Sequence, residues 1–463
     1  MKRILRGDAR SFSRHYRGEK FHAMLCDPPY ELGFMGKDWD KTGIVFDPAT
    51  WAALSEHLHP GGFGMAFASS RGWHRLAVAI EDAGLRIHPS IFGWSFGSGF
   101  PKATRIDTQI DKAAGAEREV KGQSNRGSGA QPNKLNNHGF GDTGIGYMDG
   151  SGKTFDITAP ATSLAKAWEG HRYDLQAMKP ALEPIIVFQK PYEGKPVECI
   201  VETGAGALNI DGARIPMAGD ADKAECENKN RHSDFDSGAR DNKIYGANAR
   251  TRASQGNYDA SQGRWPANFF LGDEEAARRL GEQSGERHPG ISAGKTARSI
   301  YGSQAKDEHK QIATYSDKGT AARFFFNVNR QIDEADPVMY CAKASRKERD
   351  AGLEGFEEVV AKRTQDGGDD TRGRPTPRNR NHHPTIKPID LTRWLATLLL
   401  PPSEYLPRRI LVPFAGAGSE MIGASLAGWE EVVGIEMDLE YVRIARARLA
   451  YWAARPEQLG FDL

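Results

Sequence analysis

The residues best suited to chemistry in this chain are Asp27-Pro28-Pro29-Tyr30, which follow the apolar run Phe21 to Cys26. A buried strand that ends here places the tetrapeptide at the carboxyl edge of a sheet, where open α/β folds bind ligands. The Asp27 carboxylate and the Pro28 carbonyl could accept both hydrogens of an exocyclic base amine, and the Tyr30 ring could stack on an extruded base. The pattern predicts methyl transfer to a base amine, with these four residues as the catalytic set. A plain strand end with a proline-rich turn is the alternative.

A second candidate site lies near the other end of the chain. Arg409 to Phe414 is a short apolar strand, the glycine turn Ala415-Gly416-Ala417-Gly418 follows it, and Ser419 to Trp429 is expected to be a helix. After the next strand, Glu431 to Ile435, Glu436 stands about twenty residues past the turn, the spacing at which an acid meets ribose hydroxyls in nucleotide-binding sheets. The third glycine of the dinucleotide pattern is missing, which weakens a NAD or FAD interpretation. Simple packing of a helix on a strand is the alternative.

Together the two motifs resemble the DNA amino-methyltransferases that use S-adenosylmethionine (SAM), in the permuted order in which the catalytic tetrapeptide precedes the glycine turn. Ile4 to Ala9 resembles the family's short Gly-Asp segment before the catalytic strand, and Leu58 to Gly62 resembles its lead into the fifth strand. His383 to Leu391 resembles its His-Pro-Thr-x-Lys-Pro element, which lines the methionine end of SAM. The match covers roughly residues 1–115 and 340–455.

This resemblance implies an enzyme that flips a base out of double-stranded DNA and transfers a methyl group from SAM directly to an exocyclic amine. Asp at the first tetrapeptide position is associated with N6 of adenine in the permuted group, whereas enzymes acting on N4 of cytosine more often carry Ser. We therefore expect an adenine-N6 methyltransferase. An N4-cytosine enzyme is an alternative, as is a DNA- or partner-binding protein on a degenerate methyltransferase scaffold. The chain has no Pro-Cys dipeptide, which argues against methylation of cytosine C5.

The resemblance also implies which residues hold SAM. They are Asp8, Thr385, Lys387, Phe414, Gly416, Gly418, Ser419, Glu436 and Met437. Two positions depart from the family pattern. Val412 replaces the acid that usually precedes Pro-Phe, so an acid expected near the amino group of SAM is missing. Glu420 replaces the second of two hydroxyl residues after the turn and is expected to be a solvated acid that suits the helix dipole.

Charge composition limits how the chain could bind DNA. Its 463 residues carry a formal net charge of +1, so affinity for DNA would have to come from local basic patches. The residues expected to contact phosphates are Lys343, Arg346, Arg374, Arg378 and Arg380. His382 and His383 lack partners at metal-ligand spacing and are expected to be solvated. The 4 cysteines form no C-x-x-C pair, so neither a metal site nor a disulfide framework is predicted.

The predicted fold class is α/β, with a doubly wound, mostly parallel Rossmann-like sheet and an inserted target-recognition region. We place the first half of the sheet at 1–119, the insertion at 120–335 and the second half at 336–463. An insertion fits because base edges in a duplex must be read by something that reaches the grooves. A surface insertion that binds a protein partner, or disordered sequence, is the alternative. Within it, 122–152 is expected to be a mobile loop and Glu183 to Lys190 a strand.

No stretch of the sequence is apolar enough to cross a membrane, and Met1-Lys2-Arg3 leads into a strand and not into a signal peptide. We therefore expect a cytoplasmic protein of a bacterial cell or a phage-infected host. A homodimer and a cognate restriction enzyme are partners that the resemblance allows.

Overall fold

The computed structural model describes the chain in segments. These are residues 1–32, 38–95, 102–125, 154–178, 181–217, 263–271, 346–360 and 378–454, together with 220, 223, 278, 280, 282–284, 290–293, 311–315, 325–327 and 344. Among these residues, no helix is long and apolar enough to span a bilayer.

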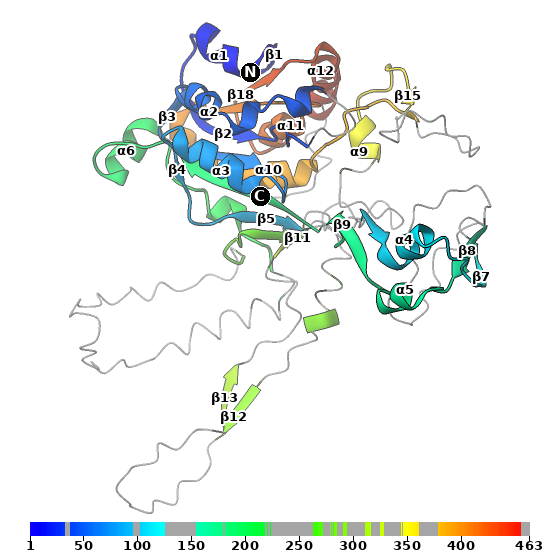
Figure 1. Ribbon diagram of the computed structural model, residues 1–463. Helices are drawn as coiled ribbons and strands as arrows, with labels where there is room; N and C mark the ends of the chain where they lie inside the picture. Colours follow the sequence, from blue (N-terminus) through cyan, green and yellow to red (C-terminus); the bar gives the residue numbers. More distant parts are fainter. Residues whose placement is uncertain are drawn as a thin grey trace, which may run out of the picture.

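A 10-stranded sheet forms the centre of the described chain (Figure 1). Its strands run in the order β1 (Lys2–Arg6), β18 (Glu431–Glu436), β17 (Arg409–Pro413), β2 (Phe21–Cys26), β3 (Leu58–Phe67), β10 (Leu182–Gln189), β5 (Phe92–Ser95), β11 (Phe269–Leu271) and β14 (Phe326–Asn327), and β4 (Arg86–Ile87) pairs with β10. Every pairing is parallel except those made by β10. The predicted mostly parallel α/β sheet is therefore confirmed.

Helices cover both faces of this sheet. One face packs against α1 (Ala9–His15), α2 (Pro48–Ser55) and α3 (Trp73–Asp82), and the other against α10 (Ile389–Leu398), α11 (Ser419–Leu426) and α12 (Leu439–Ala453). Side chains alternate between the two cores along each strand. In β10, for example, Ile185 and Val187 join one core while Ile186 and Phe188 join the other. Because both faces are covered, the sheet is doubly wound as predicted, and β2 is buried along its whole length.

Several elements from the middle of the chain belong to the sheet, so the prediction that 120–335 lies outside it is wrong in this respect. The predicted strand at Glu183 to Lys190 is confirmed as β10, but it lies inside the sheet between β3 and β5. Its buried apolar run needs cover on both faces, which a surface insertion could not supply. The helix α6 (Pro196–Thr203) contacts β3, and β11 and β14 extend the sheet beyond β5.

Part of the described middle region forms a small module beside the sheet, together with residues 102–113, which were predicted to belong to the first half of the sheet (Figure 1). It consists of β6 (Lys102–Arg105), α4 (Ile106–Ala113), β7 (Val120–Asn125), β8 (Thr154–Thr158), α5 (Ser163–Ala167) and β9 (Arg172–Gln176). A two-stranded pair, β12 (Gly290–Ala293) with β13 (Gln311–Tyr315), lies farther along the chain. Residues 122–125 of the predicted mobile loop are part of β7, and 126–152 lie outside the described residues.

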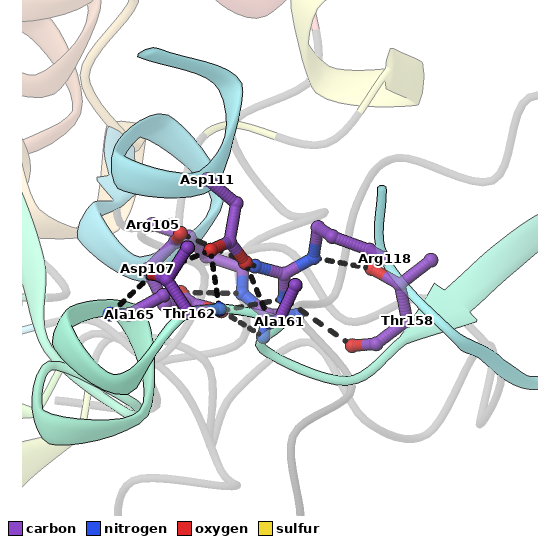
Figure 2. Close-up of polar contacts among 8 residues, drawn as sticks. All are labelled: Arg105, Asp107, Asp111, Arg118, Thr158, Ala161, Thr162 and Ala165. Carbon is purple, nitrogen blue, oxygen red and sulfur yellow. Dashed lines mark hydrogen bonds and ion pairs between the residues drawn. The ribbon is translucent and has the colours of Figure 1, made fainter. Parts of the chain in front are cut away.

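A buried polar network holds this module together (Figure 2). Arg118 ion-pairs with Asp107 at 2.8 Å and also with Asp111. Asp111 in turn accepts hydrogen bonds from the backbone N–H of Ala161 at 2.9 Å and of Thr162 at 3.0 Å. These bonds outweigh burial and lower the pKa of Asp111 to about 2. The network joins α4 to the start of α5, so it explains why a polar segment can still be ordered.

The pairing of β3 with β10 depends on a close approach at Gly64. A Cβ added to Gly64 would stand 2.1 Å from Cζ of Phe188, which is itself fully buried. We expect Gly64→Ala to lower the free energy of unfolding by about 1–3 kcal/mol, because the Phe188 ring would have to shift within a packed core. Urea denaturation measures this. Gly355→Ala is the matched control, since nothing lies within 4 Å of its added Cβ, and an equal loss in both variants would contradict the packing argument.

Candidate functional site

The predicted catalytic aspartate lies at the carboxyl end of β2, in a buried polar network from three parts of the chain. Lys387, which precedes α10, places its Nζ 2.6 Å from Oδ2 of Asp27 and 3.7 Å from Oε2 of Glu183. The Tyr30 hydroxyl donates to the same Glu183 oxygen at 3.0 Å. We call Asp27, Tyr30, Glu183 and Lys387 the Asp27 network. Because β10 is antiparallel, its first residues meet the edge at which β2 ends.

The charges in the Asp27 network depend on one another. Burial raises the pKa of Asp27, and the Lys387 ammonium opposes that rise. For Lys387, burial favours the neutral amine, but the charges of Asp27 and Glu183 outweigh burial and raise its pKa. Its Nζ also lies 5.0 Å from the centroid of the Tyr30 ring and 4.9 Å from that of Phe67, so two ring faces help to hold the cation.

One acceptor in the network has no donor. Oδ1 of Asp27 is buried and accepts no hydrogen bond of normal geometry among the described residues, Oδ2 is held by Lys387, and the nearby Tyr30 hydroxyl helps to lower the pKa of the carboxyl. A buried carboxylate oxygen without a donor is costly, and such atoms usually mark a place where a ligand or water supplies the bond. A hollow lined by Pro29, Tyr30 and Phe67, among others, lies at the end of the same tetrapeptide, and Asp27 is not part of its lining. The site can therefore accept one further hydrogen from a donor next to the Tyr30 ring.

The glycine turn after β17 is built as the sequence predicts. Gly416 and Gly418 have positive φ angles of 48° and 82°, and Phe414 has one of 59°. Glu436 is bonded directly to this turn, because its Oε2 accepts from the Gly416 backbone N–H at 2.8 Å. Its Oε1 accepts from the Asp438 N–H at 2.7 Å. Burial raises the pKa of Glu436, and these two backbone donors oppose the rise. A carboxylate fixed beside a glycine turn can bind sugar hydroxyls.

His383 packs against the same turn, so the expectation of a solvated histidine is wrong for this residue. Its Nδ1 lies 2.6 Å from the Thr385 carbonyl oxygen, and its ring lies 4.6 Å from that of Tyr441. Burial lowers the pKa of His383 to about 3. A Cβ on Gly416 would stand 2.7 Å from Nε2 of His383, so this glycine is required by its neighbour as well as by its φ angle. His382 is largely buried, with Nε2 3.3 Å from a Glu440 oxygen.

The other residues predicted to hold SAM lie in several places. Ser419 is buried at the start of α11, where its Oγ accepts from Arg448, and Met437 is exposed. Asp8 caps α1 and pairs with Arg10 at 2.7 Å. The backbone N–H of Gly7, the residue before Asp8, donates to the Glu436 carbonyl, so Asp8 lies near the end of β18. Lys387 contacts Asp27, and its contact with SAM stays a prediction.

The predicted phosphate-binding residues are only partly described. Lys343 and Arg374 lie outside the described residues. Arg346 is in α9 (Arg346–Asp350), and Arg378 is in β16 (Arg378–Asn379), which pairs with β15 (Val359–Val360). The Arg380 side chain lies 3.4 Å from a Glu358 oxygen. Contact of all five residues with phosphate stays a prediction.

Two acids at the site were not predicted. Glu183 was expected only as the start of a strand, and its place at the site depends on the antiparallel direction of β10, which the sequence does not show. Glu420, expected to be solvated, is only 4% exposed. Burial, together with the charge of Asp27, raises the pKa of Glu420 to about 7. Among the described residues, no group of side chains could hold a metal ion, and the described cysteines, Cys26 and Cys199, are buried free thiols.

Comparison with protein-family models and with curated proteins gives no match. Among solved structures, the chain is similar to M1.HpyAVI (10% identity, TM-score 0.35, covering 97% of this chain and 98% of that one). It is also similar to TTHA0409, a putative DNA modification methylase from Thermus thermophilus (10% identity, TM-score 0.36, covering 97% of this chain and 95% of that one). A third similar structure is that of the cytosine-N4-specific PvuII DNA methyltransferase (10% identity, TM-score 0.37, covering 99% of this chain and 93% of that one). The first two also have solved complexes with SAM. Similarity this weak assigns neither a fold nor a function.

The ion pair between Lys387 and Asp27 gives a test of the site's electrostatics. We expect Lys387→Met to lower the free energy of unfolding by about 3–5 kcal/mol at pH 8, because it leaves the buried carboxylate without its cation. Without Lys387 the folded-state pKa of Asp27 rises further above its unfolded value. The variant therefore loses stability as the pH rises. The difference in free energy of unfolding between the variant and the unmodified chain should be smaller at pH 5 than at pH 8.

Urea denaturation at both pH values measures the deficit. Lys190→Met is the matched control, because its loss leaves no buried carboxylate without a cation. Lys190 Nζ donates to the backbone carbonyls of Ser55 at 2.7 Å and of Leu58 at 2.9 Å. A deficit for Lys387→Met that is the same at pH 5 and pH 8 would contradict the pairing.

Proposed function

We propose that this protein is a SAM-dependent DNA methyltransferase that acts on an exocyclic base amine. The observation that carries the proposal is the unpartnered Oδ1 of Asp27, a buried acceptor beside an aromatic ring at the edge of the sheet. The parallel pairing of β2 with β17 supports the proposal, because both strands end at the same edge of the sheet and the glycine turn, to which Glu436 is hydrogen-bonded, follows β17. Methyl transfer from a nucleoside cofactor to a base requires that the two reactants be held side by side. An acceptor for the base amine and a glycine turn of the nucleotide-binding type, on adjacent strands, meet this requirement.

The residues at the turn fit SAM. Glu436 already accepts two backbone hydrogen bonds, and each of its oxygens keeps acceptor capacity for a ribose hydroxyl. The positive φ angles of Gly416 and Gly418 let the backbone turn tightly beside a ligand. When bound, SAM supplies an electrophilic methyl group. The protein's own part is to hold the two reactants in line and to keep water away from them.

The Asp27 network would orient the target base. Lys387 holds Oδ2 of Asp27, which fixes the carboxylate and leaves Oδ1 for one amine hydrogen, while the Pro28 carbonyl takes the other. With both hydrogens bound, the amine lone pair is directed out of the base plane toward the methyl group. The hydrogen bond to Glu183 holds the Tyr30 ring for stacking, which returns about 1–3 kcal/mol of the cost of flipping the base.

We further propose that the methyl group is transferred to N6 of adenine, because Asp at the first position of the tetrapeptide, here Asp27, is associated with adenine enzymes in the permuted group. We assign target choice to the middle of the chain, including the module built from 102–125 and 154–178, because the sheet itself cannot reach into a groove of the DNA. Double-stranded DNA with a flipped base is then the substrate.

Expression in a methylation-free host tests the activity. Mass spectrometry of the nucleosides should show N6-methyladenine, and single-molecule sequencing should give the site. N4-methylcytosine in its place would correct the target base, and unmodified DNA would contradict the enzyme assignment. Asp27→Asn should abolish methylation while changing SAM affinity less than about tenfold, or about 1.4 kcal/mol. Retained turnover in Asp27→Asn would remove Asp27 from the chemistry.

Calorimetry on the variant Glu436→Gln tests the proposed contact between Glu436 and the ribose of SAM. We expect Glu436→Gln to weaken SAM binding by about 1.5–3 kcal/mol, because a charged acceptor is replaced by a neutral one. Glu431→Gln is the control from the other end of β18, where Glu431 pairs with Arg409 at 3.0 Å. An unchanged isotherm for Glu436→Gln would reassign the turn to structural packing.

A further inference from the structure

The short helix α9 is bonded to both ends of the segment 381–389, which runs into α10. At the first end, Oδ1 of Asp350 accepts from the backbone N–H of Asn381 at 2.9 Å, and Nη2 of Arg349 donates to the His383 carbonyl at 2.7 Å. The Asn381 side chain returns a bond, from its Nδ2 to the Arg349 carbonyl at 3.0 Å. Asn381 is fully buried, so water competes little for these bonds.

The other end of the segment is the start of α10, and α9 holds it with a carboxylate. Oε1 of Glu348 accepts from the Ile389 backbone N–H at 2.8 Å. The first N–H groups of a helix have no partner within the helix and need an acceptor from outside it. Pro388, which precedes α10, makes no side-chain cap bond, so the acceptor comes from a residue 41 positions earlier in the chain. A carboxylate also suits the positive end of the helix dipole.

Between these two ends, the segment contacts both halves of the site. Near its start, Nε2 of His383 lies 2.7 Å from the place that a Cβ on Gly416 would take, so the segment packs against the glycine turn. Near its end, Nζ of Lys387 lies 2.6 Å from Oδ2 of Asp27. Lys387 is only two residues from Ile389, whose N–H is bonded to α9. A shift of the segment would therefore move the ammonium group away from the Asp27 carboxylate.

We propose that Glu348, Arg349 and Asp350, which we call the α9 clasp, are positioning residues that hold Lys387 where it can fix Asp27 for the base amine. The inference rests on the proposed function. Each of the three side chains bonds to a backbone group of the segment, so the clasp contributes the position of the segment and not a charge at the reacting atoms. Position matters because a misplacement of about 1 Å, caused far from the chemistry, can cost about 100-fold in rate.

The first test compares side chains that keep the clasp bonds with side chains that lose them. Glu348→Gln and Asp350→Asn keep an acceptor oxygen, so their kcat should stay within about threefold of that of the unmodified chain. Glu348→Leu and Asp350→Leu lose the acceptor. Their kcat should fall at least about tenfold, while KM for SAM and for DNA changes less than about threefold. The measurement is steady-state transfer of labelled methyl groups to DNA from a methylation-free host, at a temperature where circular dichroism shows each variant folded.

A stability cycle tests the same coupling without any activity. Urea denaturation is measured for Glu348→Leu, for Lys387→Met and for the double variant. If Glu348 acts by placing Lys387 beside Asp27, the double variant should lose clearly less stability than the sum of the two single losses. Glu354→Leu is the matched control, because Glu354 is an exposed acid that accepts from the Gly352 N–H at 3.3 Å. Its loss should add to that of Lys387→Met.

The outcomes separate the clasp from the proposed function. Losses that add in the Glu348 cycle, or amide and leucine variants with the same kcat, would overturn the inference. If the unmodified chain transferred no methyl group, the proposed function would fail, while non-additive losses would still support the placement of Lys387 by α9. Should Glu348→Leu not fold, the same measurements on Asp350→Leu, at the other end of the segment, decide between the two outcomes.

Discussion

The site depends on the parallel pairing of β2 with β17. Ile410 lies opposite Ala23 and Leu411 opposite Met24, so two strands from opposite ends of the chain finish at the same edge of the sheet. Parallel strands carry their loops at one edge, and this pairing alone sets the Asp27 tetrapeptide beside the glycine turn. The strands on either side, β18 and β3, continue in the same direction and keep that edge regular.

Burial at this edge explains the unusual charges. Asp27, Glu420 and Lys387 lie between two covered faces of the sheet, and burial is the largest influence on the pKa of each. Oδ1 of Asp27 is left without a hydrogen-bond partner among the described residues. Such an arrangement costs stability in the free protein, and it is useful where a positively charged ligand or an amine donor is to be bound.

The described residues of the middle of the chain include two parts with different roles in the structure. Residues 182–189 and 269–271 complete the sheet, whereas α4, α5 and the strands around them form a module with its own polar network. Trp394 of α10 connects the first part to the core, since its Nε1 donates to the Ala213 carbonyl and its ring lies 4.7 Å from that of Phe270. A change in these sheet residues would therefore act on the fold before it acted on any recognition of DNA.

The sequence by itself determined the elements whose signals are local. The buried strand before Asp27, the glycine turn at 415–418 and the acid at Glu436 follow from apolar runs, backbone freedom and spacing, and the structure shows the elements where these patterns predict them. Only the tertiary structure decided which distant groups meet. The antiparallel direction of β10 brings Glu183 to Tyr30, and packing around α11 buries Glu420. Neither depends on neighbours in sequence, because burial and strand direction are set by the whole sheet.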